Sequence, residues 1–320
     1  MAGFQDSTQA YLIRTNLWSR QIKELLLDEL NAMKFVRILS DFPDGYTLNI
    51  PSIGEAETGD FTEGQAVKYN QMNTGNFTFS FDQYKYSAHA ISEKFKRDSY
   101  YSADVIAAFV PRQHRALMET VETRILSQMN AGQTASSTNQ INTADHRWVA
   151  SGASQAIAFQ DFARAHYALT KANVPLVNLV AIVDPSVAYT LQTQTNMVNL
   201  LSPMPMWEGV IKEGAVTGFK FRFNVYGFDI YVSNYLPAIV SETISSVSSG
   251  ANGVANYFFS AAPGDTMPVV GGFRQMPTVY SEFNKDLQQE EYLTIAEYGF
   301  KLYRPENLVT VLSSTAVVPT

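Results

Sequence analysis

The residues best suited to bind a metal ion are four neighbouring acidic side chains, Glu55, Glu57, Asp60 and Glu63. Carboxylate oxygens are the ligands that calcium prefers, but calcium-binding loops place them at fixed positions around a glycine, and that spacing is absent here. We interpret these residues as the solvated tip of a loop. The sequence therefore predicts no metal ligands.

Residues for acid–base or nucleophilic chemistry are also dispersed. The histidines, His89, His114, His146 and His166, form no i,i+4 pair, and the chain has no cysteine to complete a metal site. No G-x-S-x-G, G-x-G-x-x-G or Walker A pattern occurs, and Asp184-Pro185-Ser186 reads as the start of a helix. We predict no catalytic residues, no cofactor-binding residues, no cofactor and no enzymatic activity.

The composition narrows the class of protein further. The chain has 320 residues, of which 46% are hydrophobic and 17% charged, and a net charge of −7. Such a length suits one large domain or two modest ones. The negative charge argues against nucleic-acid binding, which needs a basic stripe. The absence of cysteine fits a reducing cytosol, and neither a signal peptide nor a long apolar run is present, so we expect no membrane association.

An extended excursion is the most unusual predicted element. Residues 46–50 and 77–91 alternate apolar and polar side chains, which is typical of half-buried strands, with a bulge expected near residues 82–83. If they pair, each leg could reach about 65 Å, whereas a compact chain of this size has a radius of gyration of about 20 Å. Such a hairpin needs a second molecule to cover it. The intervening glycines, Gly54, Gly59, Gly64 and Gly75, would allow its tip to bend.

Helical periodicity predicts an amphipathic helix over 16–34 and a long helix from Ser102 to Gly132, broken or kinked near Pro111. The long helix carries an apolar stripe and a predicted solvent-facing row of ion-pairing residues, Arg112, Arg115, Glu119, Glu122 and Arg124. A polar loop or hairpin crossing over 131–156 follows it.

The second half of the chain mixes helices and strands. It predicts a helix over 159–172, a strand over 179–183 buried on both faces, a helix from Pro185, a hairpin over 219–235 around Gly227, a low-complexity loop over 241–256, and strands over 278–283 and 298–303. The class is α+β.

This order of elements resembles the major capsid protein of tailed double-stranded DNA bacteriophages, which has the Hong Kong 97-type shell fold. Three stretches carry the resemblance: KANVPLVNLVAIVDPSVAYTLQ at 171–192, YGFDIYVSNYLP at 226–237 and EYGFKLYRPENLVTVLSS at 297–314. The resemblance implies an N-terminal arm (1–44), an extended β-hairpin called the E-loop (45–92), a peripheral domain with a long spine helix (93–158), an axial domain with a central sheet (159–274), and return strands of the peripheral domain (275–320).

The resemblance also implies function. Such a subunit self-assembles into pentamers and hexamers of an icosahedral head, which encloses DNA without sequence-specific binding. It would be assembled in the host cytoplasm and located in the virion, with a portal, a separate scaffolding protein and a decoration protein as partners. Some relatives begin with a cleavable scaffolding segment; no long charged helical segment precedes Met1 here, so either the scaffold is a separate protein or that segment lies outside this sequence. Some relatives cross-link a loop lysine to a neighbour's asparagine, and Lys68 is the lysine in the tip region here.

We predict inter-subunit contacts at side chains whose exposure would otherwise be unfavourable. They are Leu17, Trp18 and Ile22 on the arm, Phe61, Lys68 and Tyr69 in the excursion, and Phe77, Phe79 and Phe81 on its return strand. Three alternative functions stay open: an encapsulin-type nanocompartment shell with the same fold, a phage glycan-binding adhesin module, and a hydrolase with a long lid.

Overall fold

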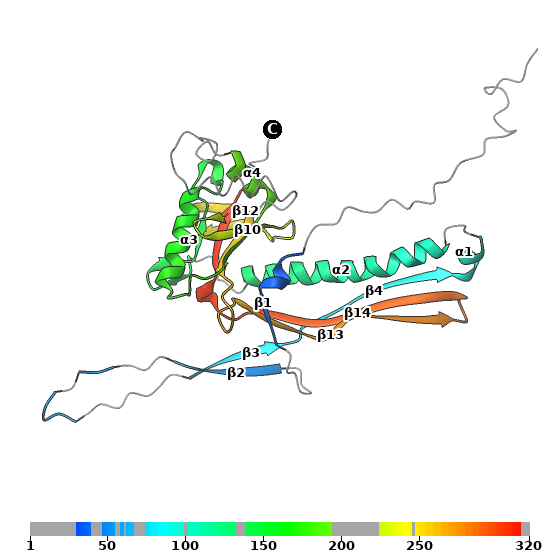
Figure 1. Ribbon diagram of the computed structural model, residues 1–320, viewed down its shortest axis with the longest axis horizontal. Helices are drawn as coiled ribbons and strands as arrows, with labels where there is room; N and C mark the ends of the chain where they lie inside the picture. Colours follow the sequence, from blue (N-terminus) through cyan, green and yellow to red (C-terminus); the bar gives the residue numbers. More distant parts are fainter. Residues whose placement is uncertain are drawn as a thin grey trace, which may run out of the picture.

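The computed structural model describes residues 30–39, 47–54, 58–60, 62–66, 74–98, 102–131, 138–193, 224–244 and 247–314. Within them the chain forms two principal sheets, each backed by helices, and a separate two-stranded hairpin (Figure 1). This is the predicted α+β class.

The first sheet is long and narrow. Its strand order is β1 (Val36–Ile38), β13 (Val269–Asn284), β14 (Gln289–Leu302) and β4 (Gln83–Ser92), with β1 parallel to β13 and the other pairs antiparallel. The helix α2 (Ser102–Ala131) runs along one face of it, and the short helix α1 (Glu93–Asp98) joins β4 to α2 (Figure 1). Alternate β14 residues such as Ala296 and Tyr298 are buried, because they form a core with α2.

The expected break of α2 at Pro111 is wrong, since the helix continues through this residue. Proline lacks one N–H donor and therefore removes a single helical hydrogen bond. The apolar stripe that follows it, Leu117, Val121 and Ile125, is buried in the shared core as predicted. Packing of this stripe holds the helix across the position where local propensity would end it.

The second sheet has the order β7 (Arg147–Val149), β15 (Val309–Ser313), β12 (Val247–Ser260), β8 (Leu179–Val183), β10 (Phe228–Val232) and β9 (Asn224–Val225), and β11 (Ala238–Ile244) also pairs with β12. One face packs on α3 (Phe159–Lys171) and α4 (Pro185–Thr193), and the other on α2. Strand β8 is buried along its whole length, with Val180 and Ile182 on the α2 side. The predicted helix over 159–172, the buried strand and the helix start at Pro185 are therefore confirmed.

Two other expectations for this region have different outcomes. The hairpin around Gly227 forms over its described part, with φ +84° at Gly227. The expected loop over 241–256 is wrong, because these residues belong largely to the β11–β12 hairpin. Its serines and glycines do not prevent pairing, since β12 continues into a segment that β15 and β8 hold from both sides. The polar crossing contains the small hairpin of β5 (Gln140–Ile141) and β6 (Ala144–Asp145), and the turn η2 (Ala153–Gln155).

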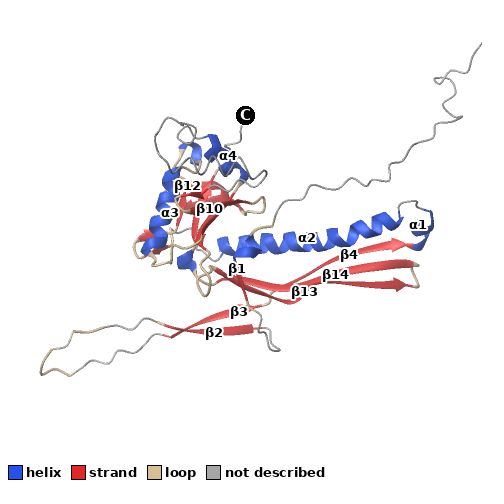
Figure 2. Cartoon of the chain, in the orientation of Figure 1, coloured by secondary structure: helices blue, strands red, loops and turns tan. Residues whose placement is uncertain are grey.

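The excursion forms a hairpin of β2 (Thr47–Ile53) and β3 (Thr74–Ser80), which lies outside both main sheets (Figures 1 and 2). The predicted continuous strand with a bulge is wrong. The chain leaves the hairpin after Ser80 and enters the first sheet at Gln83 as β4. The apolar side chains change from odd-numbered to even-numbered positions near residues 82–83 because the chain passes there from the hairpin into the first sheet.

The chain enters the described structure through the turn η1 (Ala32–Phe35), and a second short turn, η3 (Pro305–Asn307), precedes β15. The predicted helix over 16–34 lies outside the described residues up to residue 29, and its last residues belong to η1.

Candidate functional site

Most predicted contact residues fall where the structure gives no description. Leu17, Trp18, Ile22, Phe61, Lys68 and Tyr69 lie outside the described residues, and their roles stay predictions. The three phenylalanines of the return strand can be placed.

The structure contradicts the expected exposure of Phe79 and Phe81, which are 0% and 3% exposed within their own subunit. Their rings pack edge to face at 5.3 Å between centroids. Phe77 is half-buried against Tyr303, with ring centroids 4.9 Å apart, and the ammonium of Lys301 lies 5.1 Å from the Phe77 ring. The alternating aromatics thus dock the base of the hairpin on its own body, and we withdraw Phe79 and Phe81 as contact residues.

A glycine permits this docking. A Cβ atom at Gly299 would lie 2.5 Å from the carbonyl oxygen of Ser80 and 3.1 Å from Cα of Phe81, closer than Cβ contacts in proteins. Only glycine lets β14 approach β3 here. An ion pair between Arg124 of α2 and Asp82 fixes the turn that follows β3. Sequence reasoning missed both, although a glycine inside an alternating strand is a recognised sign of close backbone approach.

The helix α2 also holds the chain where it enters the body. Glu122 was expected on a solvent-facing row, but it is buried, and its Oε1 accepts hydrogen bonds from the backbone N–H of Asn31 (3.0 Å) and Ala32 (2.8 Å). Its Oε2 lies 3.0 Å from the Ala32 nitrogen. Burial raises the pKa of Glu122, and the backbone donors oppose that rise. The Arg115–Glu119 pair of the same row forms, with 2.9 Å between Nε and Oε1.

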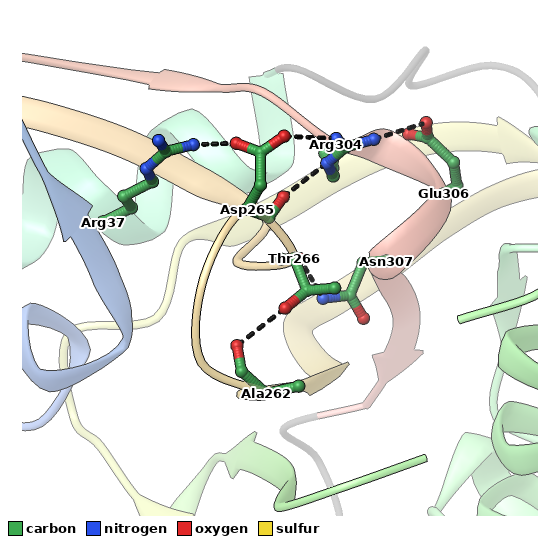
Figure 3. A network of polar contacts seen from close by, with 7 residues as sticks. All are labelled: Arg37, Ala262, Asp265, Thr266, Arg304, Glu306 and Asn307. Atoms are coloured by element: carbon green, nitrogen blue, oxygen red, sulfur yellow. Dashed lines mark hydrogen bonds and ion pairs between the residues drawn. The ribbon is translucent and has the colours of Figure 1, made fainter. Parts of the chain in front are cut away.

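A polar network joins three segments near the crossing between the two sheets (Figure 3). Asp265, in the loop between β12 and β13, pairs with Arg37 of β1 and with Arg304, which precedes η3. The Asn307 amide donates to the carbonyl oxygens of Ser260 (2.7 Å) and Thr266 (2.6 Å). It therefore ties this loop to the end of β12.

The candidate chemical residues form no reactive arrangement in the described part of the chain. Asp60 and Glu63 are exposed, whereas Glu55 and Glu57 lie outside the described residues. No group of histidine and acidic side chains that could hold a metal ion occurs among the residues that are described. Asp184 accepts the backbone N–H of Ser186 at 2.9 Å, so it begins α4 as predicted.

One surface exposes aromatic side chains, and no other described element covers it: the part of the first sheet's face opposite α2 that lies beyond the base of the hairpin. Tyr86 pairs across Ile295 with the β13 residue Thr278, and Ala88 pairs across Leu293 with Tyr280, so these side chains share a face. Tyr86 is 69% exposed and Tyr280 51%. Large aromatic side chains exposed on one face of a sheet indicate a binding surface. No helix in the described residues is long and apolar enough to cross a membrane.

The fold thus combines a long helix on a narrow sheet, a three-layer α/β unit and a protruding hairpin. Residues 78–311 match a family model described as phage capsid protein, so the chain belongs to the phage capsid protein family. No curated protein matches the chain significantly.

Solved structures agree with this family. The fold is similar to that of a chain from Mycobacterium phage Che8, with 17% identity, a TM-score of 0.69 and coverage of 94% of this chain and 97% of that one. It is similar to the capsid of the cyanophage P-SCSP1u (16% identity, TM-score 0.69, coverage 96% and 94%) and to the capsid of a native GTA particle (10%, 0.67, 98% and 100%). The Hong Kong 97-type fold is confirmed. The chain is a major capsid protein, a structural subunit of the phage shell in the virion capsid.

Proposed function

We propose that this subunit forms pentamers and hexamers that close an icosahedral head around double-stranded DNA. The observation that carries this proposal is the β2–β3 hairpin, which lies outside both sheets and whose described contacts with its own body are at its base. An isolated two-stranded ribbon is marginal in water, so its outer part needs a neighbouring subunit beneath it.

The uncovered face of the first sheet is the surface that we assign to a neighbouring copy of the chain. Tyr86 and Tyr280 give it broad apolar area with polar tips, which suits an interface that must also be soluble before assembly. In this arrangement the hairpin of one subunit contacts the sheet face of the next. Because the hairpin and the face are different surfaces of the chain, the contact is heterologous. Such a contact closes into a ring when the rotation between copies allows it.

The remaining predicted contacts are part of this proposal. They are Leu17, Trp18 and Ile22 on the arm (1–44), Phe61, Lys68 and Tyr69 in the E-loop, and Phe77 on its return strand. We propose a peripheral domain built on the first sheet and an axial domain built on the second. These domains differ from the bounds predicted from the sequence: β4 moves from the E-loop range (45–92) to the peripheral domain, and β7 and β15 move from the peripheral ranges to the axial domain. The first residues of β13 likewise move from the axial range (159–274) to the peripheral domain. A portal, a separate scaffolding protein and a decoration protein would complete the head in the host cytoplasm.

The enclosed DNA would be held without sequence-specific contacts. The net charge of −7 supports this, because a negatively charged shell binds DNA phosphates only weakly. The family match favours the capsid over the encapsulin, adhesin and hydrolase alternatives.

Negative-stain microscopy and light scattering on the purified protein test the proposal. We expect closed shells or rings of five and six, and expect Tyr86→Glu to abolish them because it places a charge in the assigned interface. Tyr167→Glu is the matched control, since Tyr167 is also exposed but lies on α3. A wild-type protein that stays monomeric at high concentration, with or without a scaffold, would contradict the proposal. Unimpaired shells from Tyr86→Glu would overturn the assigned face.

A further inference from the structure

The residues that connect the N-terminal arm to the E-loop form a short segment held at both ends. We call residues 31–39 the strap. It begins with η1, continues as β1, and ends where the Leu39 N–H donates to the carbonyl oxygen of Gly271 at 2.9 Å. Residues 1–29 precede it, and β2 of the hairpin begins shortly after it at Thr47. The strap therefore fixes where both predicted contact segments leave the body.

The strap spans the junction between the two sheets. Its Phe35 ring packs on Tyr231 of β10 and Phe259 of β12, with centroid distances of 5.0 and 5.6 Å, and these strands belong to the second sheet. The following residues, Val36 to Ile38, pair in parallel with Val269 to Gly271 of the first sheet.

Each end of the strap is held by one carboxylate from a distant part of the sequence. Glu122 accepts the two backbone N–H groups at the start, and Asp265 pairs with Arg37 near the end. The two sites differ in environment, because Glu122 is buried whereas the Asp265 side chain is 47% exposed. A buried acceptor for otherwise unpaired backbone donors is worth more than a solvated surface pair. Glu122 is therefore the dominant anchor.

We propose that Glu122 is a positioning residue for assembly: it anchors the strap on α2 and so sets the direction in which the arm and the hairpin reach neighbouring subunits. This inference rests on the proposed function. It does not require Glu122 to touch a neighbour.

Replacement of Glu122 by glutamine separates anchoring from packing. Glutamine has nearly the same shape, and its remaining oxygen can take the place of Oε1, but the NH₂ group that replaces Oε2 then faces the Ala32 N–H, 3.0 Å away, and the negative charge that strengthens both hydrogen bonds is lost. The matched control is Glu119→Gln, which makes the same chemical change three residues away on the same helix, where the side chain pairs with Arg115.

Hydrogen–deuterium exchange on the purified protein measures how firmly Glu122 holds the backbone of the strap. We expect exchange of the peptide covering residues 31–39 to be about tenfold faster in Glu122→Gln, with exchange in β8 and β12 unchanged. We also expect a several-fold lower yield of closed shells, with malformed shells among the products. Glu119→Gln should behave like wild type in both measurements.

The two readouts distinguish failure of this inference from failure of the proposed function. Unchanged exchange of the strap in Glu122→Gln would show that Glu122 is not the anchor, and faster exchange with normal shells would show that the anchor does not direct assembly. Wild-type protein that forms no shells would refute the proposed function, while exchange still decides the anchor.

If Glu122→Gln does not fold, Asp265→Asn tests the other end of the strap, where the carboxylate is 47% exposed. Faster exchange of the strap together with a lower shell yield would then support the inference. Normal shells despite a loosened strap would overturn it. The control is Asp286→Asn at the exposed tip between β13 and β14.

Discussion

Arg147 and Glu242 form a buried, two-pronged ion pair: Nε and Nη2 of the guanidinium each donate to a different carboxylate oxygen at 2.7 Å. Nη2 also donates to Oδ1 of Asn130 at 2.8 Å, near the C-terminal end of α2. The pair therefore joins β7, β11 and α2, which are remote from one another in the sequence. Its rigid geometry fixes the spine helix against the second sheet.

Glu242→Gln should destabilise the subunit by about 3–5 kcal/mol, because it leaves the Arg147 charge buried without its counter-ion. The double replacement of Arg147 by Met and Glu242 by Leu should recover most of this loss, since it removes both charges. Chemical denaturation of the unassembled subunit measures both. A loss below about 1 kcal/mol in the single variant would show that water reaches the pair in solution.

Asp161→Ala should destabilise the subunit by about 2–4 kcal/mol. The Asp161 carboxylate accepts the N–H of Ala158 at the start of α3 (2.9 Å), the indole N–H of Trp148 (3.2 Å) and the N–H of Ser151 (3.1 Å). Removing it leaves buried donors unpaired. The control in the same denaturation experiment is Asp145→Ala, which breaks a more exposed pair with Arg164 and should change stability by less than about 1 kcal/mol. Equal losses in both variants would contradict this assignment.

Gly299→Ala should loosen the base of the hairpin, because the new methyl group would overlap the Ser80 carbonyl oxygen. We expect a loss of about 1–3 kcal/mol and faster hydrogen–deuterium exchange in β3. Gly59→Ala is the matched control, since a Cβ atom there meets nothing within 4 Å. If β3 exchanges as in wild type, the close approach of β14 to the hairpin does not hold in solution.

Stability should fall as the pH decreases from about 7 to 5, in part because of His146. Burial lowers the pKa of His146 below its usual range, although the Ala144 carbonyl, 3.1 Å from Nδ1, opposes the shift. The unfolded chain then binds a proton at a pH where the folded chain does not, which favours unfolding on the acid side. His146→Gln should therefore reduce the pH dependence of the unfolding midpoint over this range.

The exposed His114 provides the control for this measurement, and His114→Gln should leave the pH dependence unchanged. One histidine can change the free energy of unfolding by at most about 1.4 kcal/mol per pH unit. An identical pH profile for wild type and His146→Gln would exclude His146 as the source.

The sequence by itself determined the elements whose pattern is local and strong. The continuous apolar run at 179–183 has to lie between two layers, and Asp184-Pro185-Ser186 has to begin a helix, because both follow from backbone chemistry within a few residues. The order of such elements was sufficient to identify the family. The alternation of Phe77 and Phe79 was correct as a strand pattern, whereas Phe81 lies just after the strand.

Only the tertiary structure decided what each of these patterns packs against. Alternation shows that one face of a strand is covered, but not whether the cover is a neighbour or the same chain, and here Phe79 and Phe81 are buried in their own body. Glu122 looks like any surface acid on a charged helix, because its backbone partners, Asn31 and Ala32, lie far away in the sequence. Burial of a side chain depends on contacts that the fold creates at long range, and a local pattern does not contain them.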